Sequence, residues 1–300
     1  MTITYLTNTS SGAPALTGAA GSLIGVLDFC LVTTLGWSKA FSGTNTASYR
    51  APTGNRLYLG VDNSGTLNAR VRGFETMTAA GVAVASGTGP FPTDMQESGG
   101  QYIYVSSDTS TVRAWRFISD GTFFYFSSAY KGVNYGNLFS FGDIVSYATA
   151  DAYATVIGGD ASASSASQGP YFVAGPAVVS SYGYSYTARN YTQVGVAVKS
   201  GKLFSLNISS MHGILGQSSS GVTYPSLADG ALYAQRVYSA ETNYLRGHFP
   251  GLWAPGHNLP FIDGDTFTGS GDLAGRTFIV WSPTSNNFQV LLETSDTWRA

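Results

Sequence analysis

The sequence predicts a mainly β protein of antiparallel, sandwich-like sheets, in one or two β-domains. It also predicts one amphipathic helix near the N-terminus and a short helix near residues 149–157. From residue 37 onward, short runs of alternating apolar and polar residues recur between Gly, Asn and Asp turns. Only the first forty residues contain a helical pattern longer than one or two turns. At 300 residues, the chain can bury a sizeable core.

The first element is a polar arm over residues 1–20, which is rich in Gly, Ala and Thr and has little to bury. We expect this arm to be mobile or laid across a neighbouring molecule. Ser22 then begins the predicted helix, which ends near Gly36. Its apolar residues recur every three or four positions and form one face: Leu23, Ile24, Val26, Leu27, Cys30 and Leu31. Cys30, the single cysteine, is expected to be a core residue and cannot form an internal disulfide.

Residues 21–158 are expected to combine this helix with an antiparallel β-domain. The strands predicted here share an apolar-polar alternation: Arg56–Val61, Ala69–Phe74, Gln101–Ser106, Val112–Ile118 and Thr122–Phe126. The first two pair across the turn Asp62–Gly65, the next two across Asp108–Ser110, and the last follows the turn at Asp120. Thr149 is a suitable N-cap for the short helix, which ends at Gly158.

A Ser/Ala-rich stretch, residues 159–169, has almost nothing to bury and is predicted to be an exposed loop between domains or subdomains. Residues 170–300 then form a second β-rich part. Its predicted strands are Gln193–Val198, Leu203–Ile208, Leu232–Val237, Thr277–Trp281 and Gln289–Glu293.

Charged residues are scarce, at 11% of the chain, whereas about 25% is average for a soluble domain. Hydrophobic residues make up 43%, which argues against disorder. Tyrosine (19), glycine (37), serine and threonine take the place of charge. A tyrosine ring can lie in a contact surface without a charged partner, so we expect much of the exterior to contact other protein. The alternative is a secreted β-protein with an uncharged, hydrated surface.

The distribution of charge and apolar residues disfavours two classes of partner. The net charge is −2 and no Lys/Arg cluster is present, so a nucleic-acid partner is not expected. The longest apolar segment, Leu23–Val32, contains Asp28 and is too short to cross a bilayer. Residues 2–12 lack the basic and then apolar pattern of a signal peptide. We therefore expect synthesis in the cytoplasm and no membrane insertion.

The residues that carry chemistry form no recognisable catalytic motif. His212, His248 and His257 have neither zinc-protease spacing nor an accompanying nucleophile motif, so no catalytic residue and no cofactor is predicted. The densest carboxylate group is Asp263 and Asp265, with Asp272 further on, in a Gly-rich stretch that could hold Ca²⁺. The terminal Glu of an EF-hand is absent, so a structural turn is favoured over a metal site.

Large aromatic side chains are the candidate contact residues. The interface candidates are Trp37, Tyr58, Trp253 and Trp298. Tryptophans can also stack on sugar rings, which keeps open a role in binding a host glycan. A third alternative, a glycan depolymerase, requires two carboxylates facing each other in one cleft, and the sequence does not place such a pair.

Several stretches resemble a known family. They are Gly36–Asn45, Leu57–Gly65, Ala69–Met77, Gly87–Pro92, Phe141–Asp143, Asp151–Tyr153, Asp229–Tyr233, Arg246–Pro255, Gly264–Phe267, Leu273–Phe278 and Leu292–Trp298. With these, the chain from about Gly21 to its end is similar to virion structural proteins of tailed bacteriophages, most of them uncharacterised.

The resemblance implies a non-enzymatic structural role in the virion after synthesis in the host bacterium. The position is left open among tail, baseplate, neck and capsid surface, where a protein can decorate the capsid. The implied partners are other copies of the chain and other virion structural proteins. The alternative within the particle is a tail protein that binds a host receptor glycan.

Overall fold

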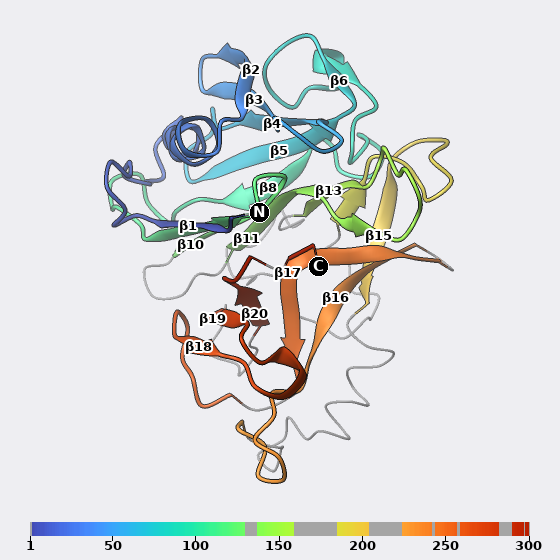
Figure 1. Ribbon diagram of the computed structural model, residues 1–300. Coiled ribbons are helices and arrows are strands. Elements are labelled where there is room, and N and C mark those ends of the chain that lie inside the picture. Colours follow the sequence, from blue (N-terminus) through green and yellow to red (C-terminus); the bar gives the residue numbers. More distant parts are fainter. Residues whose placement is uncertain are drawn as a thin grey trace.

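The structure is a computed structural model that describes residues 2–129, 137–158, 185–203, 224–241, 244–256, 259–281, 290–296 and 298–299. It consists mainly of antiparallel strands, as predicted, with a helical segment near the N-terminus (Figure 1). The helical elements are α1 (Ser22–Leu27), the π-helical segment η1 (Asp28–Thr34) and the 3₁₀ turns η2 (Val84–Ser86) and η4 (Gly271–Leu273). None of the helices in these ranges has the length and apolar character needed to cross a membrane.

The predicted N-terminal helix is confirmed. Every residue of the expected apolar face is buried, and Cys30 has no exposed surface. Cys30 is therefore a core residue, and its burial raises the pKa of its thiol. Asn63 lies before β5 in the chain, and its side chain accepts a hydrogen bond from the backbone amide of Leu23 at 2.9 Å. The segment ends before Gly36, whose φ of 69° lies in the left-handed region that favours glycine.

One five-stranded sheet lies against this helix. Its strands, in spatial order, are β2 (Ser38–Gly43), β3 (Thr46–Arg50), β4 (Tyr58–Asp62), β5 (Asn68–Phe74) and β8 (Gln101–Tyr104). A separate pair is formed by β6 (Thr76–Met77) and β7 (Gly87–Thr88). Tyr58 lies opposite Phe74 and Val61 opposite Val71, which confirms the first predicted hairpin.

The remaining strands form one long antiparallel sheet. In spatial order, its main path is β1 (Thr4–Thr7), β9 (Trp115–Ser119), β10 (Phe123–Ser128), β11 (Asn137–Asp143), β13 (Thr155–Gly158), β14 (Ser185–Thr187), β15 (Val198–Leu203), β16 (Ala234–Glu241), β17 (Tyr244–Pro255), β20 (Val290–Glu293), β19 (Thr277–Trp281) and β18 (Thr266–Thr268). Strand β12 (Val145–Ser146) pairs with β17 beside this path.

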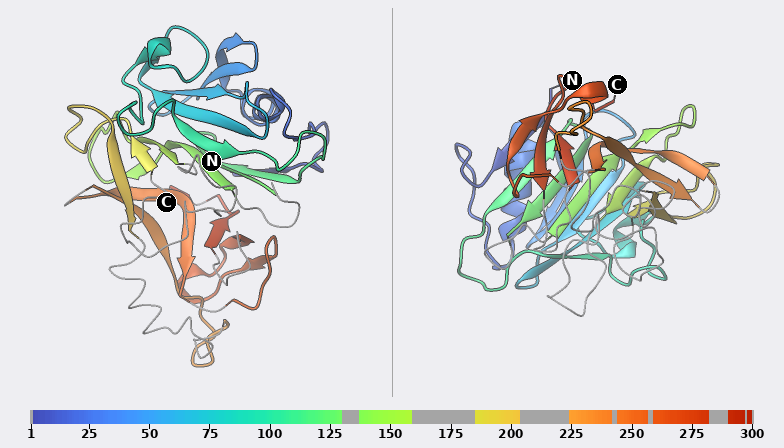
Figure 2. Two further views of the ribbon diagram at one scale, coloured as in Figure 1. Left: turned by 180° about the vertical axis from the view of Figure 1, so that it is seen from behind. Right: turned by 90° about the horizontal axis from the view of Figure 1, so that it is seen from below.

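The long sheet folds back on itself, and the result is three layers (Figures 1 and 2). Its first strands form the middle layer, with the five-stranded sheet and α1 on one face and strands β16 to β20 on the other. One core fills the first space, and Trp37, Val71 and Phe124 belong to it. A second core fills the other space, where Phe123, Phe249 and Trp281 meet.

Strand β10 shows how the sequence produces this arrangement. All six of its residues are buried, because both of its faces are covered. Phe124 and Phe126 point into the first core, whereas Phe123 and Tyr125 point into the second. The Tyr125 hydroxyl donates a hydrogen bond to the Pro250 carbonyl at 2.8 Å, which satisfies its polar group inside the second core.

The short helix predicted near residues 149–157 is wrong. Residues 147–153 are bends and turns, and Thr155–Gly158 form β13. Ala150 has a φ of 54°, and the Asp151 carboxylate accepts a hydrogen bond from the Tyr153 amide, both of which stop a helix. Val156 and Ile157 then alternate between the two cores, a period of two residues that fits a strand.

The second predicted hairpin, between residues 101–106 and 112–118, is also wrong in its pairing. Strand β8 pairs with β5, whereas β9 pairs with β1 and β10, so the two strands belong to different sheets. The link between them is a turn in which Asp108 accepts hydrogen bonds from the amides of Ser110 and Thr111. The chain leaves one sheet there and enters the other. The turn predicted at Asp120 does join β9 to β10 as expected.

The strand predictions for the second half have mixed outcomes. Thr277–Trp281 is confirmed as β19, Gln289–Glu293 as β20 and Leu232–Val237, in part, as β16. Gln193–Val198 is wrong, because turns built on Asn190 and on Gln193 (φ 64°) occupy this stretch before β15. Leu203 ends β15, and the rest of the strand predicted over Leu203–Ile208 lies outside the described residues.

The predicted arm and domain boundaries can be compared with the strands. Thr4–Thr7 of the arm form β1, which pairs with β9 of the same chain. The loop predicted over residues 159–169 lies outside the described residues. Strands from both sides of it, β13 and β14, pair in the long sheet. The division into 21–158 and 170–300 stays a prediction.

Candidate functional site

A hollow of about 280 Å³ lies between two segments that are far apart in the sequence. One wall comes from Glu75, the residues Thr88–Pro90 and Thr93, beside the small β6–β7 pair. The other wall is part of the connection between β14 and β15, drawn in yellow in Figure 1, which contributes Ala188, Arg189 and residues 195–197. We call this the Glu75–Arg189 hollow.

An ion pair joins the two walls. Arg189 Nε lies 2.5 Å from Glu75 Oε1 and Nη2 lies 2.6 Å from Oε2, which is a bidentate arrangement. The side chains are 28% and 16% exposed, respectively, so the pair is accessible from the hollow. The guanidinium carbon also lies 4.0 Å from the centre of the Tyr153 ring, and Nη1 donates to the Gln193 carbonyl at 3.3 Å. These contacts hold the Arg189 guanidinium in one orientation.

Hydrogen bonds fix the rest of the walls. Gln96 Nε2 donates to the Ala197 carbonyl at 2.8 Å, and Gln96 Oε1 accepts from the Thr93 amide at 2.9 Å. On the first wall, Gly89 allows the Glu75 side chain to pass, since a Cβ at Gly89 would lie 2.4 Å from Glu75 Cγ. The two walls are therefore joined at both Arg189 and Gln96.

A buried ionic network lies behind the second wall and stabilises it. Arg246 of β17 has no exposed side-chain surface and donates to both oxygens of Asp151 at 2.9 Å and to Glu241 at 2.6 Å. It also donates to the carbonyls of Arg189 and Tyr153. The buried arginine thus positions the backbone of Arg189, which lines the hollow, and of Tyr153, whose ring contacts the Arg189 guanidinium.

The charges in this network stabilise one another. Burial acts to raise the pKa of Asp151, but hydrogen bonds from Arg246 and Ser146 outweigh burial and hold the pKa below its usual value. Glu241 also accepts a hydrogen bond from the amide of Tyr191 at 2.8 Å, which ties the β14–β15 connection to β16. The network joins segments that are up to 95 residues apart.

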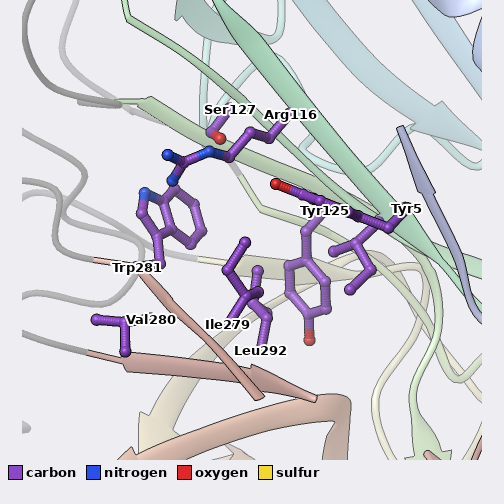
Figure 3. Close-up of a pocket in the computed structure, with 9 residues that line it drawn as sticks. Tyr5, Arg116, Tyr125, Ser127, Ile279, Val280, Trp281 and Leu292 are labelled. Carbon is purple, nitrogen blue, oxygen red and sulfur yellow. The ribbon is translucent and has the colours of Figure 1, made fainter. Parts of the chain in front are cut away.

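A second hollow has a different character. It lies between the middle layer and β19, and its volume is about 10 Å³, enough for one water molecule. Figure 3 shows the Arg116 guanidinium beside the Trp281 ring, with Ile279, Leu292 and Tyr125 on the apolar side. Because it is mostly apolar and very small, this hollow is a packing feature of the second core.

The predicted carboxylate group does not come together as a metal site. Asp263 forms an ion pair with Arg116 at 2.9 Å, and Asp265 accepts a hydrogen bond from the Ile262 amide at 2.9 Å. Asp272 lies exposed in η4. In the described ranges, no three carboxylate, imidazole or thiol side chains are grouped so that they could hold a metal ion.

The interface candidates are mostly buried within this chain. Trp37 belongs to the first core, Trp298 to the second and Trp253 to a third, smaller cluster with Phe278. Their exposed fractions are 2%, 2% and 7%, respectively, so their rings are packed inside the molecule. Tyr58 is half-buried, and the Arg50 guanidinium lies 4.9 Å from the centre of its ring.

Of the three histidines, only His248 lies in the described ranges. It is 3% exposed, with Arg236 Nη1 2.5 Å from Nε2 and the Tyr147 hydroxyl 3.1 Å from Nδ1. Because arginine can only donate, Nε2 must accept, and the ring proton lies on Nδ1. Burial, with the charge of Arg236 as a further cause, lowers the pKa of His248 to about 4.

Sequence reasoning did not identify the residues of the Glu75–Arg189 hollow or of the Arg246 network. Glu75 and Arg189 lie 114 residues apart, and neither belongs to a motif with a known spacing. Only the folded chain brings them to one place.

In comparisons with known proteins, no protein-family model and no curated protein matches the chain.

Proposed function

We propose that this chain is a non-enzymatic structural component of a bacteriophage virion, which acts by assembling with copies of itself or with other virion proteins. Its position could be the tail, baseplate, neck or capsid surface. The proposal rests on the resemblance and on where the charged side chains lie.

Few charged side chains are fully exposed: in the described part of the chain, six charged residues are buried and 17 are partly buried. Of the 28 charged residues whose burial is described, five are exposed, namely Arg56, Asp94, Asp229, Asp272 and Asp296. In most soluble proteins, charged residues are mainly exposed. The exterior of the described part is therefore poorer in charge than the composition alone indicates, and this observation carries the proposal.

The type of cation agrees with this distribution. The chain contains eleven arginines and four lysines. Arginine suits planar, bidentate ion pairs and is enriched in protein interfaces, whereas lysine is depleted there. Arg72, Arg246 and Arg299 each contact a carboxylate and a backbone carbonyl within the chain. Such cations stabilise the fold through contacts within the chain.

Apolar side chains are exposed at one end of β17. Tyr244 and Leu245 are about half exposed, and the ring of Tyr191 stacks on Tyr244 with the ring centres 3.6 Å apart. Tyr147, also half exposed, lies beside this strand, since its amide donates to the Arg246 carbonyl at 2.8 Å. Exposed aromatic side chains are typical of protein contact surfaces.

The decisive experiment is to locate the protein in particles. Antibodies raised against the purified chain would be applied to washed virions of the phage that encodes it, together with mass spectrometry of the same particles. We expect regular labelling at one position and several copies per particle. Absence from washed particles, with the protein present only in the lysate, would contradict the proposal.

A further inference from the structure

The Glu75–Arg189 hollow has the features of a binding site for a small polar molecule. Its walls are joined by the Arg189–Glu75 pair and by the hydrogen bond from Gln96 to Ala197, so little ordering remains for binding to impose. Its volume of about 280 Å³ lies just below the range for small-molecule sites, which is about 300–1,000 Å³. A site of this size accommodates one or two small rings.

The ion pair offers donors and acceptors side by side. Arg189 has five N–H groups, of which two donate to Glu75 and one to the Gln193 carbonyl. Among the described residues, the two other N–H groups have no acceptor. Each Glu75 oxygen accepts one hydrogen bond from Arg189 and can accept another. A hydroxyl group both donates and accepts, so two neighbouring hydroxyls match this arrangement.

The charge of the site selects for a neutral ligand. Of the described residues that line the hollow, only Glu75 and Arg189 are charged, and together they carry no net charge. A phosphate or carboxylate ligand would have to compete with Glu75 for the guanidinium and would be repelled by it. The Pro90, Ala188 and Val196 side chains supply apolar surface, and Thr93 supplies a hydroxyl. This combination fits a ring that has apolar C–H groups and several hydroxyls.

We propose that the Glu75–Arg189 hollow binds a neutral carbohydrate, with the Arg189–Glu75 pair contacting two adjacent hydroxyl groups of one sugar ring. Tyr153 and Arg246 act as positioning residues, because they hold the Arg189 side chain and backbone, respectively. The inference concerns one site on the chain and does not depend on the proposed role in assembly.

The test uses the full chain and four neutral sugars: glucose, galactose, mannose and N-acetylglucosamine. Saturation-transfer NMR would report binding, with glucuronate and inorganic phosphate as anionic comparisons. We expect at least one neutral sugar to bind and neither anion to do so.

The variants Glu75→Gln and Arg189→Lys each remove the bidentate pair. Each should weaken sugar binding about ten-fold, the effect of losing one charge-assisted hydrogen bond. Asp263→Asn is the matched control, because Asp263 is in a similarly exposed ion pair with Arg116 outside the hollow. This control should bind sugar as the unmodified chain does, and thermal unfolding would verify that all three variants fold.

Three results would overturn the proposal: no binding of any neutral sugar, preferential binding of an anion, or equal binding by Glu75→Gln and the unmodified chain. None of these results bears on whether the protein is found in particles, so the two proposals fail separately.

Discussion

Two arginine–carboxylate groups lie close together in this molecule and differ mainly in burial. Arg246 has no exposed side-chain surface, and its partners Asp151 and Glu241 are 1% and 5% exposed. Arg189 and Glu75 are 28% and 16% exposed and border a hollow. The Arg246 guanidinium contacts the Arg189 carbonyl, so the two groups are adjacent. The comparison indicates that the buried group maintains the fold, whereas the accessible group can be used for binding.

The largest effect is expected for Arg246→Met, which removes the centre of the buried group. Two buried carboxylates and two carbonyls would each lose the hydrogen bond from Arg246, and the carboxylate charges would lose their cation, so the free energy of unfolding should fall by about 3–5 kcal/mol. Urea unfolding followed by circular dichroism measures this difference. A loss below about 1 kcal/mol would place Arg246 among ordinary surface ion pairs.

A smaller effect is expected for Asp151→Asn, which keeps the shape but removes one charge. The amide can still accept from Arg246, so the loss should be about 2 kcal/mol at neutral pH. The folded-state pKa of Asp151 is lowered, so its contribution is present above the unfolded pKa and disappears as the pH falls through the folded value. Stability measured against pH should therefore fall less steeply below about pH 4 in the variant. If stability falls equally steeply at acid pH in the variant and in the unmodified chain, Asp151 does not make this contribution.

His248 should make the stability of the protein depend on pH in a range above that of Asp151. Its folded pKa of about 4 lies below the unfolded value of 6.5, so folding favours the neutral ring. The corresponding stability is present above pH 6.5 and is lost as the pH falls toward 4, by about 3 kcal/mol. The variant His248→Gln has no ring to protonate, so between pH 4 and pH 6.5 its free energy of unfolding should no longer fall with decreasing pH on account of this residue. If the stability of the variant depends on pH as strongly as that of the unmodified chain, other groups cause the dependence.

The smallest effect on stability is expected for Glu75→Gln. Its ion pair is partly exposed and therefore screened by solvent and salt, so the cost should be below about 1 kcal/mol and should shrink further at high salt. Denaturant unfolding at low and high salt measures both. A loss as large as that of Arg246→Met would show that the two groups do not differ in the way proposed.

Local sequence patterns predicted those helices and strands that have one packed face, because that face sets the spacing of their apolar residues. The helix beginning at Ser22 and the strands around Val61 and Val71 follow such patterns. The helix expected near residue 150 is replaced by a turn at Ala150 and Asp151, and Arg246 binds the Asp151 carboxylate from a strand 95 residues away. The pairing expected between β8 and β9 failed because the chain changes sheets at Asp108, and a turn signal does not specify which strands it joins.

The candidate site was less accessible to sequence reasoning. The tryptophans were the obvious aromatic residues, yet three-layer packing buries Trp37, Trp253 and Trp298. Their burial depends on how the long sheet folds back, which no local pattern encodes. Likewise, nothing near Glu75 or Arg189 indicates that these two residues meet. The low charge content was visible, but not that most of the charged residues would pair internally.

We propose that the exterior of this molecule carries few charges because copies of the chain contact one another. Sedimentation velocity of the purified chain over a wide concentration range tests it most directly, at low and at high salt. We predict that the chain self-associates and that the association persists at high salt, because apolar and aromatic contacts are not screened. A single monomeric species at every concentration would contradict the claim.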